Sequence, residues 1–104
     1  MRVATPFEWQ QQCRLIDERD RLRRLLTDLR AAATRRSDYE PHDITDDEAA
    51  IQADLVEARL AATDSALGRI DTGGYGICSQ CASQISVARL EALAAAPLCL
   101  RCAA

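Results

Sequence analysis

The chain has 104 residues, the size of one ordinary domain, and a net charge of only −3. It contains one Phe, one Trp and two Tyr, and much of its apolar content is alanine, which argues against a large core and favours thin helical packing. No stretch approaches the roughly 20 consecutive apolar residues of a membrane span, and the N-terminus lacks the apolar run of a signal peptide. We therefore expect a cytoplasmic protein without membrane contact, whose cysteines remain reduced.

The charges are divided into blocks along the chain. Residues 5–36 carry eight Arg against five acidic residues, whereas residues 37–57 carry eight acidic residues and neither Lys nor Arg. The basic block could bind nucleic acid, but its acidic residues lie at helix spacing from arginines, which favours a solvated, ion-paired helix face. DNA affinity depends on neutralising several phosphates, so we expect no direct sequence-specific DNA binding.

The first predicted element is a long helix over residues 5–36. Thr5, Pro6 and Glu8 are typical of a helix start, with a capping side chain, a tolerated proline and a glutamate three residues after the cap. An apolar stripe at near-heptad spacing predicts a coiled-coil-like seam, formed by Leu15, Leu22, Leu25, Leu29 and Ala32.

The N-terminal end of this helix is richer in large apolar side chains, which indicates packing against another part of the chain. These side chains are Phe7, Trp9, Cys13 and Ile16. We expect Cys13 to be buried there, because a free cysteine commonly behaves as a small apolar residue. A redox thiol near the metal-binding end is the alternative for Cys13.

Residues 37–44 read as an acidic loop, and a second helix is predicted over residues 45–71. Pro41 disfavours helix in the loop, and Thr45 followed by Glu48 repeats the capping pattern. The second seam alternates in steps of four and three, through Ala49, Ala53, Val56, Leu60, Thr63, Leu67 and Ile70. Two such helices joined by a short loop predict an antiparallel hairpin, a rod about 40 Å long with a negative tip.

The C-terminal part, residues 72–104, contains two Cys-x-x-Cys pairs, Cys78 with Cys81 and Cys99 with Cys102, separated by seventeen residues. Each pair allows a tight turn to direct two sulfurs at one metal, and the longer gap brings the second pair back to complete a tetrahedron. We therefore predict one zinc ion bound by these four cysteines. Disulfides are the alternative, favoured only in an oxidising compartment.

Four cysteine ligands would leave no open position on the metal for water or substrate, so the predicted zinc is structural and its binding energy contributes to folding. The chain shows no credible catalytic triad and no glycine-rich phosphate loop, and we expect no catalytic residues and no enzyme activity. A short helix is predicted between the two pairs, from Ser86 to Ala96, with Val87, Leu90 and Leu93 on one face and Pro97 as its end.

Residues 74–102 resemble the DksA/TraR family. The resemblance extends over Gly74-Tyr75-Gly76, both cysteine pairs, Ile85 and the run Arg89-Leu90-Glu91-Ala92, and over residues 5–71 it is one of architecture only. It implies a protein that binds bacterial RNA polymerase and inserts its hairpin into the secondary channel, where acidic tip residues alter initiation. Some members act together with the alarmone ppGpp.

The family's tip motif is Asp-x-x-Asp-x-Ala. Asp43 and Asp46 match both aspartates and are the predicted partner-binding residues, whereas Glu48 stands at the position of the alanine. Ala82 replaces a glycine that is common after the second cysteine of the first pair.

Taken together, the sequence predicts an all-α fold. Its parts are a helical hairpin over residues 1–71 and a four-cysteine zinc finger over residues 72–104. The predicted function is transcription regulation through RNA polymerase. A zinc-stapled adaptor for another protein and a thiol-based redox switch are the alternatives.

Overall fold

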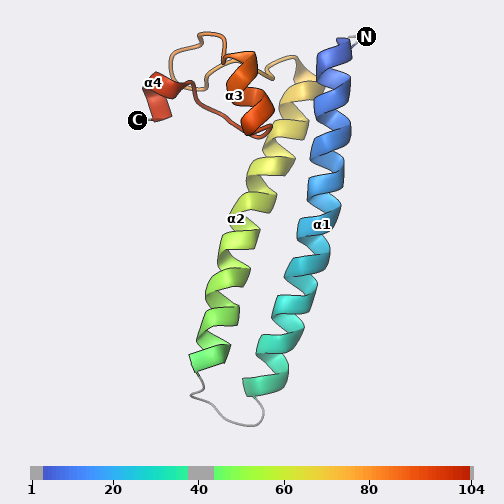
Figure 1. The fold of residues 1–104 in the computed structure, drawn as a ribbon, viewed down its shortest axis with the longest axis vertical. Helices are drawn as coiled ribbons and strands as arrows, with labels where there is room; N and C mark the ends of the chain where they lie inside the picture. The colour runs from blue at the N-terminus through green and yellow to red at the C-terminus, as the bar shows by residue number, and fades with distance from the viewer. Residues whose placement is uncertain (1–3, 38–43, 104) are drawn as a thin grey trace.

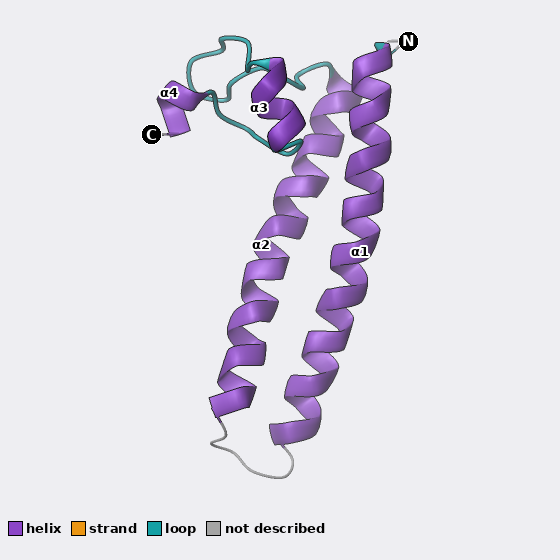
Figure 2. Ribbon diagram, in the orientation of Figure 1, coloured by secondary structure: helices purple, strands orange, loops and turns teal. Residues whose placement is uncertain are grey.

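The computed structural model describes residues 4–37 and 44–103, with side chains for residues 4–32 and 48–103. Two long antiparallel helices, α1 (Pro6–Ser37) and α2 (Ile44–Thr72), form a rod, and a small finger folds against its base (Figure 1). The finger contains two short helices, α3 (Val87–Ala92) and α4 (Leu100–Ala103), connected by loops (Figure 2). Among the described residues, β-pairing is limited to one isolated bridge between Ile77 and Gln84. The predicted all-α class is confirmed.

The start of α1 follows the expected capping pattern. The backbone N–H of Glu8 donates to Thr5 Oγ1 at 3.1 Å, and the N–H of Trp9 donates to the Thr5 carbonyl at 2.9 Å. The bond to the Thr5 hydroxyl satisfies an N–H group that a helix start otherwise leaves without a partner, and the bond to the Thr5 carbonyl is the first of the helix itself. The helix then runs without a break through the arginine-rich segment, so the molecule measures 52 × 30 × 20 Å.

The hairpin is held by a narrow seam rather than a broad core. Leu22 and Leu26 of α1 pack with Ala53 and Val56 of α2, and Leu29 and Leu60 lie partly buried beside them. The sequence assigned Leu25 to this seam, but Leu25 is 45% exposed and Leu26 takes its place. Since adjacent residues are about 100° apart on a helix, only one of these two leucines can face α2.

A second cluster of buried side chains lies at the base, where the hairpin meets the finger. Leu15 of α1 and Ala66 and Ile70 of α2 pack with finger residues that include Ile85 and Leu90. Ala66, which the predicted seam omitted, is completely buried. Most of the finger's buried side chains therefore share one core with the helices.

Polar contacts complete both sides of the seam. Thr63 is buried, and its hydroxyl donates to the Arg59 carbonyl at 2.8 Å, so its burial leaves no unsatisfied group. Arg59 also pairs with Glu18 of α1 at 3.0 Å. Arg30 pairs with Glu57 across the other side of the hairpin.

A C-terminal cap ends α2 and turns the chain toward the finger. Gly73 adopts φ 89°, and the N–H of Gly74 donates to the Arg69 carbonyl at 2.8 Å. This is the Schellman arrangement, in which a residue with positive φ lets the chain fold back over the last carbonyls. Neither long helix, nor any other in the described residues, is long and apolar enough to cross a membrane.

Removing the side chain of Leu22 should destabilise the hairpin, because Leu22 is only 4% exposed and a thin seam has few atoms that can close the cavity. We expect Leu22→Ala to lower the free energy of unfolding by about 2–5 kcal/mol. Leu25→Ala is the matched control, and its effect should stay within about 0.5 kcal/mol. Denaturant unfolding followed by circular dichroism measures both, and equal losses would contradict this description of the seam.

Candidate metal centre

The first cysteine pair lies on a tight turn that follows α2. The N–H of Cys78 donates to the Ser83 carbonyl at 2.8 Å, and the N–H of Ile85 donates to the Gly76 carbonyl at 2.7 Å. Within the turn, the N–H of Ala82 donates to the Cys78 carbonyl at 3.0 Å. The loop is thereby closed by backbone bonds, with the two cysteines on the same turn.

Ala82 adopts φ 60° and is the one residue other than glycine with positive φ among those described. A side chain in this left-handed region brings Cβ close to the backbone, at a cost of roughly 1–2 kcal/mol. This cost gives a physical reason for the glycine that the family resemblance led us to expect at this position.

The second cysteine pair begins just after Pro97 and runs into α4. Ser79, inside the first pair, reaches the Pro97 carbonyl with its backbone N–H at 2.9 Å and its hydroxyl at 3.1 Å. The N–H of Ala103 donates to the Cys99 carbonyl at 2.9 Å and closes the turn of α4. These contacts bring the second pair alongside the first.

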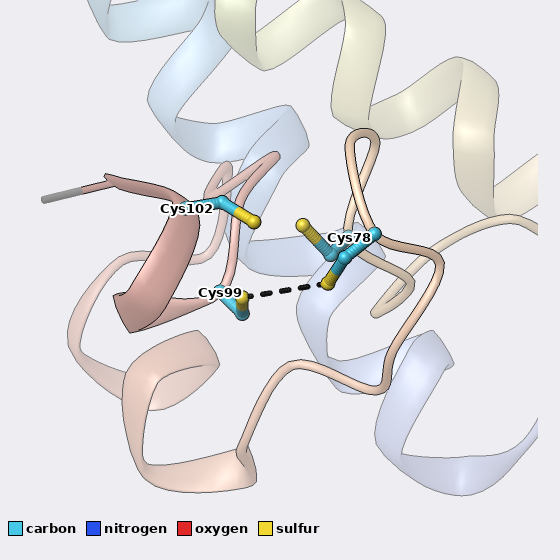
Figure 3. Close-up of side chains that lie close together, drawn as sticks. Cys78, Cys99 and Cys102 are labelled. Carbon is cyan, nitrogen blue, oxygen red and sulfur yellow. Dashed lines mark hydrogen bonds between the residues drawn. The ribbon is translucent and has the colours of Figure 1, made fainter.

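The structure brings the four predicted ligands together. The Sγ atoms of Cys78, Cys81, Cys99 and Cys102 all lie within 4.8 Å of one another. Figure 3 shows the side chains of Cys78, Cys99 and Cys102 turned toward a common centre. The Sγ atoms of Cys81 and Cys99 are 3.7 Å apart. A tetrahedron with Zn–S distances of 2.3 Å has sulfurs about 3.8 Å apart, so this arrangement fits zinc.

The surroundings of the sulfurs also suit a cation. Backbone N–H groups, first that of Cys81 and then that of Cys99, lower the pKa of the Cys78 thiol to about 6. Hydrogen bonding from Ser83 lowers the pKa of Cys81. The crowding of sulfurs acts in the opposite direction on Cys102, where contacts with Cys78 and Cys99 raise the pKa to about 12.

These opposed shifts mean that the cluster stabilises some thiolates but resists carrying four negative charges at once. A divalent cation at the centre relieves the repulsion, and metal binding then releases the remaining protons. Because all four donors are thiols, the site fits a structural zinc ion with no open coordination position.

The segment between the pairs differs from the prediction. Helix α3 ends at Ala92, and Leu93 adopts an extended conformation with φ −140°. Leu90 is buried as expected, but Val87 and Leu93 are 55% and 50% exposed. The chain after α3 contributes Ala94 and Ala96 to the base cluster instead.

The apolar residues at the N-terminal end of α1 differ in how deeply they are buried. Phe7 packs partly buried against the base cluster, as expected for a helix end that contacts another part of the chain. Trp9 is 61% exposed. The expectation that Cys13 is buried was wrong, since Cys13 is exposed. It lies two residues, or about 200°, from Leu15 on the helix, on the face opposite the seam.

The predicted tip residues are not tested by this geometry. Asp43 lies outside the described residues, and Asp46 is in the first turn of α2, where the side chains are not described. Their role at the tip remains a prediction.

Comparison with known proteins agrees with the site. Residues 73–104 match the model of the prokaryotic dksA/traR C4-type zinc finger family. The solved structure of transcription factor DksA2 from Pseudomonas aeruginosa resembles the chain with a TM-score of 0.78 at 19% sequence identity, covering 93% of this chain and 80% of that one. No curated protein matches the sequence significantly.

The fold and the cysteine cluster define a helical hairpin that carries a C4-type zinc finger. Over residues 73–104 the predicted resemblance to the DksA/TraR family is confirmed by the family model, and the likeness to DksA2 shows that the fold of the chain is similar. A structural zinc ion is accordingly the cofactor of the chain.

Zinc content tests the assignment of the ligands. Protein purified in reducing buffer without chelator should contain about one zinc per chain by mass spectrometry, and Cys99→Ser should lose most of it, because a hydroxyl is a poor replacement for a thiolate. Cys13→Ser provides a control for the removal of a thiol outside the cluster, and it should retain the metal. Well under one zinc in the unmodified chain, or equal loss in both variants, would contradict the four-cysteine site.

The backbone at Ala82 gives a second prediction, whose sign is unusual. Ala82→Gly should raise the stability of the zinc-loaded protein by up to about 1 kcal/mol, because relief of the left-handed strain exceeds the entropy cost of glycine. The same change at exposed Ala58 inside α2 should lower stability by about 1 kcal/mol. Thermal unfolding compares the two, and a loss at position 82 would refute the assigned strain.

Proposed function

We propose that this protein is a transcription regulator that binds bacterial RNA polymerase and inserts the tip of its hairpin into the secondary channel. The observation that carries the proposal is the combination of a long hairpin with a DksA/TraR-type zinc finger at its base, in a fold resembling a transcription factor. The action would be electrostatic and steric, without a covalent step. The protein would act in the cytoplasm as a regulator and not as an enzyme.

We further propose a division of labour between the two parts, the hairpin over residues 1–71 and the finger over residues 72–104. The finger and the base of the hairpin would dock at the rim of the channel, and the rod would carry the tip inward. The length of the molecule, 52 Å, supports this division because it separates the tip from the metal site.

A groove at the base supports docking there. It has a volume of about 360 Å³ and lies between the two long helices and residues 92–95 of the finger. Glu18 pairs with both Arg21, at 3.4 Å, and Arg59, at 3.0 Å. Arg14, which also lines the groove, contacts the Leu90 carbonyl at 3.5 Å. Three guanidinium groups against one carboxylate leave the groove basic, and an acidic protein surface would complement it.

The tip would act through Asp43 and Asp46, which match the family motif. Their block of eight acidic residues without Lys or Arg would repel itself, and a cationic or metal-containing surface would offset that cost. Glu48 is exposed and stands where the family has alanine, which makes the tip still more negative.

A binding and transcription assay tests both parts of the proposal. The purified chain should retain RNA polymerase core in a pull-down, and a known secondary-channel factor should compete. Asp43→Asn combined with Asp46→Asn should reduce the effect on transcription at least about tenfold while leaving polymerase affinity within about threefold, because the tip acts after docking at the base. Repeating the assay with ppGpp examines the alarmone response that the resemblance implies.

The matched control is Asp64→Asn combined with Asp71→Asn, which makes the same change of charge at exposed positions of α2 outside the acidic block. This control should keep full activity. Undiminished activity of the tip variant would refute the tip role. Failure to capture RNA polymerase would refute the main proposal and favour an adaptor for a different protein.

A further inference from the structure

Two buried polar side chains join the hairpin to the finger. Gln11 of α1 and Tyr75, which follows α2, are only 5% and 8% exposed. Polar groups buried this deeply are costly unless each finds a partner, so their contacts show what the junction requires.

The contacts form a continuous chain of hydrogen bonds. Gln11 Nε2 donates one N–H to Tyr75 Oη at 3.0 Å and the other to the Leu90 carbonyl at 2.9 Å. Tyr75 Oη donates to the Ala94 carbonyl at 2.7 Å. Burial raises the pKa of Tyr75, so the hydroxyl keeps the proton that it donates. We call Gln11 and Tyr75 the clamp.

The clamp connects the approaches to both cysteine pairs. Tyr75 lies three residues before Cys78, and Ala94 lies five residues before Cys99. The bond between Tyr75 and Ala94 therefore fixes the distance between two chain segments that must converge for four sulfurs to meet. Gln11 adds a third fixed point, because it lies on the long helix α1, outside the finger.

Apolar packing of Leu90, Ala94 and Ala96 in the base cluster and the bonds of the clamp hold the segment of residues 90–96 in place. Helix α3 is six residues long, too short to be stable alone, and the segment after it has no regular structure. Two other hydrogen bonds from the hairpin to this segment are longer and only partly buried, from Arg14 to the Leu90 carbonyl at 3.5 Å and from Arg69 to the Ala95 carbonyl at 3.3 Å.

We propose that Gln11 and Tyr75 are positioning residues for the zinc site, which hold the two cysteine pairs close to their metal-bound arrangement. A preorganised site loses less entropy on binding, so the clamp strengthens zinc binding from outside the ligand shell. Linkage makes the effect reciprocal, and bound zinc tightens the contact between finger and hairpin by the same factor. This proposal concerns zinc and the hairpin alone and does not depend on polymerase binding.

Zinc affinity of the full-length chain is the decisive measurement. In a competition with a chromogenic chelator, Gln11→Ala and Tyr75→Phe should each bind zinc about tenfold more weakly than the unmodified protein. Gln10→Ala, an adjacent and exposed glutamine, is the matched control and should bind zinc with unchanged affinity. The double clamp variant should be far less than a hundredfold weaker, since both substitutions break one network.

Hydrogen exchange supplies a readout of the reciprocal effect. Removing zinc from the unmodified protein should speed amide exchange in the first turns of α1, around Gln11, as well as in the finger. In Tyr75→Phe, whose ring still fills the base cluster, the response around Gln11 should largely disappear.

Two results would overturn the proposal. One is zinc affinity within twofold of the unmodified protein in both single variants, which would mean that the clamp contributes to packing but not to zinc binding. The other is weaker zinc binding accompanied by loss of hairpin helicity in circular dichroism, because the effect would then come from unfolding and not from positioning.

Discussion

The structure depends on one constraint, which is that the finger cannot form a core without the hairpin. Its buried residues, such as Ile85, Leu90 and Ala96, lie in the same cluster as Leu15, Ala66 and Ile70 of the long helices. A segment of about 30 residues buries too little apolar surface to fold alone, so it needs a metal and a surface to pack on. Zinc supplies the first and the base of the rod supplies the second.

Sequence patterns predicted the parts of the fold that depend on local chemistry, including two long helices, the cap of the first helix and the cysteine cluster. It could not choose between Leu25 and Leu26, because both are leucines and the choice depends on which side of α1 faces its partner. The end of α3 was missed for a related reason. Alanines at 94–96 favour helix, yet the chain leaves the helix at extended Leu93 and packs them against the base cluster in a turn.

The clamp also could not be predicted from the sequence. Gln11 lies in a polar stretch of three consecutive glutamines, and nothing local distinguishes it from Gln10 or Gln12. Its importance arises from contacts with Tyr75 and Leu90, which are 64 and 79 residues away in the chain. Tyr75 belongs to the family's Gly-Tyr-Gly motif, which singles out this residue but does not predict that it contacts Gln11.

The zinc site and the acidic block of residues 37–57 have opposite chemical characters. Four thiols close the metal to substrate and to water, so the site can only shape the protein. The acidic block contains no Lys or Arg of its own, and its described part begins at the end of α2 far from the finger. Because the two helices form a rigid rod, the position of its base determines the position of its negative end. The buried hydrogen bonds of Gln11 and Tyr75 lie at that base. Through them, the binding of zinc affects how firmly the hairpin is held against the finger, and therefore its orientation.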